Sequence, residues 1–145
     1  MANYQKILLA VDLSDDSAEV ADRAQALTRN NDAELHIIHV IEPLSFAYGG
    51  DIPMDFSGIQ DEIHQQAVTQ LDRFAEARDL GKDRRHVVLG QPEVEIHALA
   101  EELSADLVVV GSHGRYGLAL LMGSTANGVL HGATCDVLAV RVGHH

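Results

Sequence analysis

One short segment near the amino terminus defines the architecture. It is the apolar run Lys6-Ile7-Leu8-Leu9-Ala10-Val11, followed directly by Asp12-Leu13-Ser14-Asp15-Asp16-Ser17. A short, continuous apolar run that polar residues terminate is typical of a strand buried on both faces. The polar residues favour a helix start, because Ser14 can cap it and aspartates suit the positive end of a helix dipole. The segment therefore predicts a buried strand, a turn and a helix to about Arg29.

The same alternation continues along the rest of the chain. Further strands are predicted at residues 34–41, 86–89, 107–110 and 136–142. Segments of helical period lie between them at residues 58–80, 92–103 and 124–131, whereas residues 43–57 show no period. Strands that alternate with helices require a mostly parallel sheet with helices on both faces. The sequence thus predicts one α/β domain over residues 1–145, with five strands and four helices.

Composition excludes several classes of function. Ten Lys and Arg against 22 Asp and Glu give the 145 residues a net charge of -12. Such a surface repels a phosphodiester backbone and an anionic membrane, so neither nucleic acid nor membrane is expected as a partner. The single Cys135 cannot form an internal disulfide, and neither a signal peptide nor a long apolar span is evident. We expect a soluble cytoplasmic protein.

The charge map singles out one segment. No acidic residue occurs between Asp106 and Asp136, and the only formal charge there is Arg115, near His113. Glycines in this segment allow backbone N–H groups to approach an anion, and a helix that begins at Ser124-Thr125 adds hydroxyls and a dipole. An acidic residue after a first strand can instead accept hydrogen bonds from a ribose. A nucleotide satisfies both ends, with its sugar toward Asp12 and its phosphates toward Gly114, Gly123 and Ser124.

Structural explanations exist for the same residues. Glycines at 111, 114, 117 and 123 also suit turns, Ser124 and Thr125 suit a helix cap, and Asp12 suits closure of the first helix. Val40 alone reads as core. His36 and His39 are three apart in a strand, point to opposite faces and cannot share a metal. Neither a hydrolase elbow nor a Walker loop is present, so no catalytic residue is assigned.

The residues resemble a known family. The matching motifs are Ile7-Leu8-Leu9-Ala10-Val11-Asp12-Leu13-Ser14, His39-Val40-Ile41, Gly111-Ser112-His113-Gly114, Gly123-Ser124 and Val137-Leu138-Ala139-Val140. Together they are similar to a universal stress protein of the UspA type, over essentially the whole chain. The resemblance implies a Rossmann-like three-layer sandwich with strand order 3-2-1-4-5. That order places the ends of the first and fourth strands side by side.

The resemblance also implies a nucleotide site. Members that bind ATP carry the motif Gly-x2-Gly-x9-Gly-Ser/Thr. By this likeness Asp12 and Gly111 hold the ribose, and the backbone of Val40 reads adenine. Ala10 and Val110 line the same pocket. The phosphate side falls on Gly114, Gly123 and Ser124, with Thr125 following, and the charge map adds Arg115. The implied ligand is ATP, with ADP and AMP open, and with Mg²⁺ bound mainly by the phosphates.

One departure from the family pattern leaves alternatives open. Eight residues, 115–122, separate Gly114 from Gly123 where the pattern has nine. The shorter loop either misplaces an N–H beyond hydrogen-bond tolerance or is relaxed by Gly117. The resemblance implies a nucleotide-sensing stress-response module, a homodimer through residues 136–142, and a protein partner that the sequence does not identify. The alternatives are a slow ATPase or phosphotransferase using His113 or Ser124, and a dimeric interaction protein that needs no nucleotide.

Overall fold

The central layer of the molecule is a five-stranded parallel sheet. The computed structural model describes residues 4–43, 57–113 and 132–142. Its strands are β1 (Lys6–Ala10), β2 (Glu34–Ile41), β3 (Arg85–Leu89), β4 (Leu107–His113) and β5 (Asp136–Val142). They lie in the order β3-β2-β1-β4-β5, and every neighbouring pair is parallel. The predicted parallel sheet and its strand order are confirmed.

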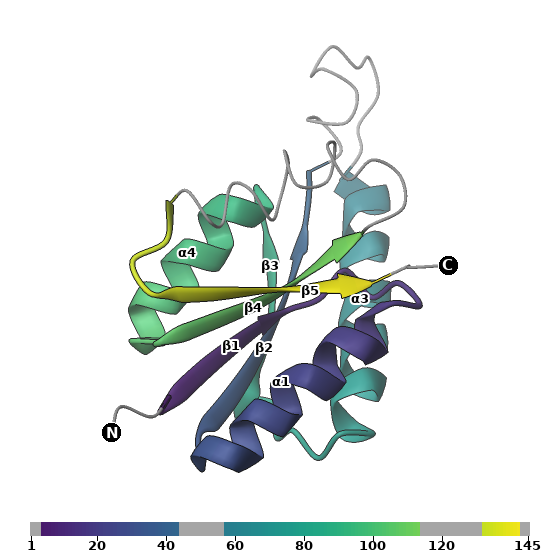
Figure 1. Ribbon diagram of the computed structural model, residues 1–145. Helices are drawn as coiled ribbons and strands as arrows, with labels where there is room; N and C mark the ends of the chain where they lie inside the picture. The colour runs from purple at the N-terminus through teal and green to yellow at the C-terminus, as the bar shows by residue number, and fades with distance from the viewer. Residues whose placement is uncertain (1–3, 44–56, 114–131, 143–145) are drawn as a thin grey trace.

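Helices cover both faces of this sheet. The described helices are α1 (Ser17–Asn31), α3 (Ser57–Glu76) and α4 (Pro92–Leu103), with a short 3-10 turn η1 (Lys82–Arg84). Helices α1 and α3 lie on one face and α4 lies on the other, which gives the predicted three layers (Figure 1). The fourth predicted helix, residues 124–131, falls outside the described residues. None of the helices in the described part of the chain combines the length and apolar character that crossing a membrane requires.

The strand pattern produces two apolar cores. Successive residues of a strand point to opposite faces, so a continuous apolar run buries both sides. In β1, Leu8 packs toward α4 and Leu9 toward α1 and α3, and both are fully buried. The same alternation places Val108 and Val109 of β4 in opposite cores. The sheet is therefore held by side chains from both layers of helices.

Several predicted boundaries shift in the structure. Helix α1 begins at Ser17 and its N-cap is Asp16, so the expected cap at Ser14 is wrong. Helix α3 ends at Glu76 rather than near Leu80, because Asp79 adopts a left-handed φ of 62°. Ile59 fits the helical period of residues 58–80, but its side chain is 47% exposed in the first turn.

Strand β4 is longer than predicted, and this extension bears on the site. The sequence suggested a strand that ends at Val110 and a glycine-rich loop that begins at Gly111. In the structure Gly111, Ser112 and His113 continue β4 and align with Val140, Arg141 and Val142 of β5. The long partner strand extends the ladder by three residues. Gly111 is therefore a strand residue near the carboxyl end of β4, where the sequence predicted the start of a loop.

Candidate functional site

A cavity lies where the strand order reverses. Strands β1 and β4 are neighbours in the centre of the sheet, with β2 beside β1 on one side and β5 beside β4 on the other. Ligands of open α/β sheets bind beyond the carboxyl ends of the strands at such a point. The structure has a cavity of about 200 Å³ there. Its lining residues are Ala10, Val11, Asp12, Asp16, Ser17, Val20, Ile38, Val40, Glu42, Pro92, Ile96, Val110, Gly111 and Val142.

The cavity brings together half of the predicted site residues. Ala10, Asp12, Val40, Val110 and Gly111 come from the ends of three strands and all line it. The other five predicted residues, Gly114, Arg115, Gly123, Ser124 and Thr125, lie outside the described residues. The described walls thus hold the positions assigned to base and sugar, and the positions assigned to phosphates are not described.

Some lining residues were missed by sequence reasoning. Glu42 follows β2 directly, just as Asp12 follows the apolar run Lys6–Val11 in the sequence, and that signal could have been used. Asp16 and Ser17 stand at the start of α1, where only dipole and capping roles had been considered. Pro92 and Ile96 reach the cavity from α4. Their part depends on how α4 packs over the sheet, which no local pattern reveals.

Asp12 organises the turn between β1 and α1. Its Oδ1 accepts hydrogen bonds from the Ser14 backbone N–H at 3.0 Å, the Ser14 Oγ at 2.6 Å and the Ser17 Oγ at 3.0 Å. Within this turn Leu13 has φ 61°, a left-handed conformation that costs a residue with a Cβ about 1–2 kcal/mol. Asp12 therefore has the structural role expected of it, because its carboxylate closes the turn that leads into α1. Asp12 is also exposed at the cavity, so a ligand hydroxyl can reach it.

Strand β2 turns main-chain groups toward the cavity. Val11 N–H donates to Ile38 O at 3.0 Å, and Gly90 N–H donates to Ile41 O at 2.9 Å. In a parallel ladder the N–H and C=O of one residue face the same neighbour, and the direction alternates along the strand. Val40, two residues after Ile38, therefore directs both groups toward the side of β1, where that strand has already ended.

His39 strengthens this arrangement. A continued ladder would offer Val11 O as the acceptor for the N–H of Val40. The Val11 carbonyl instead accepts a hydrogen bond from His39 Nδ1 at 2.9 Å. The side chain of His39, on the α1 face of the sheet, thus occupies the carbonyl that the Val40 N–H would bond in a continued ladder. The donor and acceptor of Val40 therefore lie on the side of β2 that faces the cavity.

The charge of the described walls is one-sided. Apolar side chains such as Val20, Ile38 and Val110 form the interior. Among the described lining residues, three carboxylates (Asp12, Asp16 and Glu42) and no cationic side chain occur. Carboxylates attract hydroxyl and amine donors and repel phosphate. This part of the cavity suits the uncharged portion of a ligand.

Histidines in the described residues form no metal centre. His36 and His39 lie on opposite faces of β2, as their spacing predicts, because His36 contacts His86 on the α4 face while His39 contacts Val11. No group of three or more His, Cys, Asp or Glu side chains in the described segments is arranged to hold a metal ion.

These features define the class of protein: a Rossmann-like α/β sandwich with a part-apolar, part-acidic cavity at the switch point of its sheet. The profile of the universal stress protein family matches residues 3–141. Universal stress protein A homolog 1 of Coxiella burnetii is 43% identical over 140 residues, which cover 95% of this chain and 96% of that protein. The chain belongs to the universal stress protein family.

Solved structures agree on the fold. A universal stress protein crystallised in complex with cAMP is 27% identical, with a TM-score of 0.64, and the match covers 96% of this chain and 98% of that one. The hypothetical protein MJ0577 is 20% identical, with a TM-score of 0.77 and coverage of 97% and 98%. At that identity the second likeness bears on the fold alone.

Proposed function

We propose that this protein is a cytoplasmic stress-response module that binds an adenine nucleotide, with ATP as the leading ligand, and passes its nucleotide state to a protein partner. One observation carries the proposal. Ala10, Asp12, Val40, Val110 and Gly111, chosen from the sequence, converge on one cavity at the switch point. A relative that crystallised with cAMP supports an adenine nucleotide as the ligand class.

The main-chain groups of Val40 provide the basis for adenine recognition. An N–H donor beside a C=O acceptor complements adenine, whose N1 accepts and whose N6 amine donates. Guanine presents the reverse pattern at the corresponding edge. The geometry of β2 therefore favours ATP over GTP, and the apolar walls at Ala10 and Val110 pack against the flat faces of the base.

The charge of the cavity walls suggests where the sugar and the phosphates of the nucleotide lie. Ribose hydroxyls donate to the Asp12 carboxylate, which stands exposed at the cavity. A volume of about 200 Å³ is smaller than the roughly 300–1,000 Å³ of sites for drug-sized ligands, so the described walls take only the base and sugar. The triphosphate then extends to Gly114, Arg115, Gly123, Ser124 and Thr125, with Mg²⁺ held mainly by its oxygens.

Assembly forms a second part of the proposal. Strand β5 pairs with β4 on one side, and no other described strand covers its second edge. An apolar edge strand is an aggregation hazard unless it is paired, and a two-fold mate removes the edge. We expect a homodimer through residues 136–142. Light scattering at micromolar concentration should give twice the chain mass of 15.7 kDa, and a monomer there contradicts this assembly.

Titration calorimetry and thermal unfolding of nucleotide-free protein test the ligand. At about 100 times the dissociation constant, Mg-ATP should stabilise the fold by roughly 2.7 kcal/mol, a rise of several degrees, while GTP has little effect. Ala10→Leu fills the cavity and should abolish the ATP response. Ala98→Leu, at an exposed position of α4, is the matched control and should retain it.

The outcomes separate the three candidate functions. An ATP response that Ala10→Leu removes and Ala98→Leu keeps supports the binding module. Steady ATP turnover above the water rate that His113→Ala removes favours the slow enzyme. Absence of any response to either nucleotide, with an intact dimer, favours the nucleotide-independent interaction protein.

A further inference from the structure

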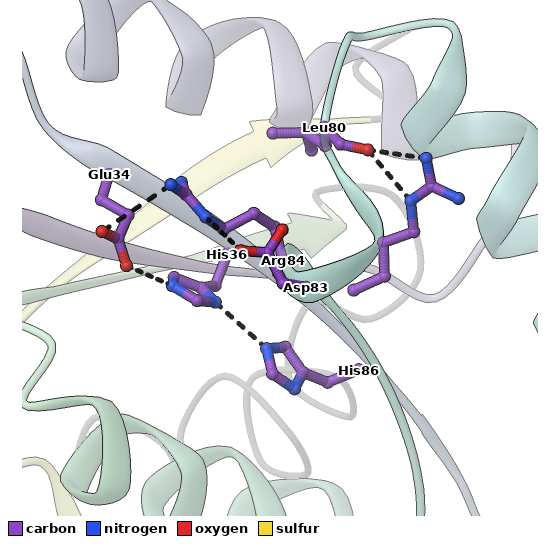
Figure 2. A network of polar contacts seen from close by, with 7 residues as sticks. Glu34, His36, Leu80, Asp83, Arg84 and His86 are labelled. Atoms are coloured by element: carbon purple, nitrogen blue, oxygen red, sulfur yellow. Dashed lines mark hydrogen bonds and ion pairs between the residues drawn. The ribbon is translucent and has the colours of Figure 1, made fainter.

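A chain of polar contacts lies far from the cavity, at the amino-terminal ends of β2 and β3. His36 is 6% exposed, and its Nε2 lies 2.6 Å from Glu34 Oε2. Its Nδ1 lies 3.1 Å from His86 Nε2 on the neighbouring strand (Figure 2). The two ring centroids are 5.3 Å apart and tilted by 31°. The carboxylate and the two rings thus form one continuous chain across the α4 face of the sheet.

Counting the available hydrogens assigns the donors and acceptors of these contacts when both rings are neutral. The Glu34 carboxylate only accepts, so His36 Nε2 must donate. A neutral imidazole has one N–H, so His36 Nδ1 is an acceptor and His86 Nε2 donates to it. One added proton leaves a single hydrogen between the facing nitrogens. A second added proton places hydrogens on both, which removes the bond and sets two positive rings 3.1 Å apart at their nearest atoms.

Charged groups from the packed elements surround the pair unevenly. Arg84 of η1 lies 3.7 Å from the second oxygen of Glu34 and also 3.7 Å from Asp83, and Lys6 of β1 adds positive charge near Glu34. Glu102 of α4 is the acidic group that favours a charged His86. Burial, followed by positive charge at His36, nevertheless holds the pKa of His86 below its ordinary value of 6.5.

We propose that the His36–His86 pair is an acid-sensitive latch: it holds the edge strand β3 to β2 at neutral pH and releases it when both rings are protonated. Strand β3 has β2 as its only neighbour among the described strands, and the histidine contact adds a side-chain bond to the five-residue ladder between them. Release of β3 also loosens η1 and α4, which flank it in sequence. The latch lies beyond the nucleotide proposal and does not rest on it.

The direction of the pH effect follows from proton linkage. Because the folded state holds the pKa of His86 below 6.5, the unfolded state binds more protons below that pH. The stabilisation is complete above about pH 6.5 and is lost as pH falls through the folded-state pKa. The His36 N–H also lowers the pKa of Glu34 from its ordinary 4.5, and that contribution is lost only in more acid solution. The two effects therefore occupy separate pH windows.

Thermal unfolding at pH 7.5 and pH 5.5 tests the latch. The variant His86→Gln keeps an N–H donor for His36 but takes up no proton. The control His64→Gln removes an exposed histidine of α3. Between the two pH values, wild type and the control should lose roughly 3 °C or more beyond the loss of His86→Gln. Equal pH dependence in all three proteins overturns the proposal.

A second measurement on wild type keeps the test decisive if His86→Gln folds poorly. Histidine ring resonances and amide exchange should be followed by NMR from pH 7.5 to pH 5. The expected result is loss of amide protection in residues 85–89 once both rings are protonated. Unchanged protection of β3 after both rings are protonated contradicts the latch.

Discussion

The two ends of the same sheet are built differently. At the amino ends of the strands, polar groups meet partners within the protein: Asp106 accepts hydrogen bonds from the backbone N–H groups of Gln5 and Lys6 at 2.9–3.1 Å. At the carboxyl ends, β1 turns away through Leu13 in a left-handed conformation, and Val40 directs main-chain groups toward a cavity. The amino end therefore pairs polar groups within the protein, and the carboxyl end borders a cavity.

The same apolar strands thus support a paired amino end and a carboxyl end that borders a cavity. Strands β1, β2 and β4 are buried along their centres, so stability does not require that both ends of the sheet be equally closed. Tyr4 is a second example of internal pairing at the amino end of the sheet. Its hydroxyl donates to Asp136 Oδ2 at 2.7 Å, and this bond joins the starts of β1 and β5. That bond, with burial, raises the pKa of Tyr4 above its ordinary 10.0. The cavity lies at the opposite end of the sheet, beside the carboxyl ends of β1, β2 and β4.

Loss of the Asp106 carboxylate should have the largest effect on the closed end. Asp106→Ala removes the acceptor for two backbone N–H groups at the start of β1, and we expect a loss of about 2–3 kcal/mol in the free energy of unfolding. Asp106→Asn keeps one acceptor oxygen and should lose about half as much. Urea unfolding measures both, and ATP affinity should not change.

The Asp61→Ala variant, at an exposed position of α3, serves as the control for lost charge. If Asp106→Ala costs no more than the roughly 0.5 kcal/mol typical of surface changes, the amino end is not held as described. If Asp106→Ala also abolishes ATP binding in folded protein, the two ends are not independent.

Changes at Asp12 address the open end. Asp12→Ala should weaken ATP binding by roughly 10- to 100-fold, or about 1.4–2.8 kcal/mol, because the ribose loses its acceptor. Ser17→Ala removes one of the hydrogen bonds within the turn and leaves the carboxylate, so its affinity should stay close to wild type. Calorimetry measures both. Equal losses in the two variants would assign the effect to turn geometry instead of the carboxylate.

A small gain is expected from Ser104→Gly. Ser104 ends α4 near the amino end of β4 with a left-handed φ of 57°. Glycine adopts this conformation without a Cβ penalty, so the free energy of unfolding should rise by about 0.5–1 kcal/mol. Ala98→Gly, in the interior of the same helix, should lower it by about 0.5–1 kcal/mol. Urea unfolding distinguishes the two, and a loss in both would show that the Ser104 side chain matters.

Much of the open end was predictable because its residues occupy strand ends. The run from Lys6 to Val11 marks a buried strand, and the position directly after it singles out Asp12. The same logic, applied to β2, would have found Glu42. The extension of β4 to His113 was missed because it depends on β5, a partner 29 residues away from Leu107 at its start.

The contact between His36 and His86, at the amino end of the sheet, could not be predicted from the sequence. His36 and His86 are 50 residues apart, and their contact depends on the β2–β3 register, in which Ile38 stands opposite His86. Apolar strands fit several registers equally well by pattern alone. Ile59 likewise fits the helical period and still lies exposed, because periodicity does not say which turns of a helix meet the sheet.

Amide NMR of the nucleotide-free protein, titrated with Mg-ATP, tests directly whether the carboxyl end is the binding end. We predict that signals of Asp12, Val40 and Gly111 shift on addition of ATP, while those of Gln5 and His86 stay in place. Mg-GTP should leave both groups nearly unchanged. Shifts confined to the amino end, or ATP binding without any shift at Val40 and Gly111, would contradict the account.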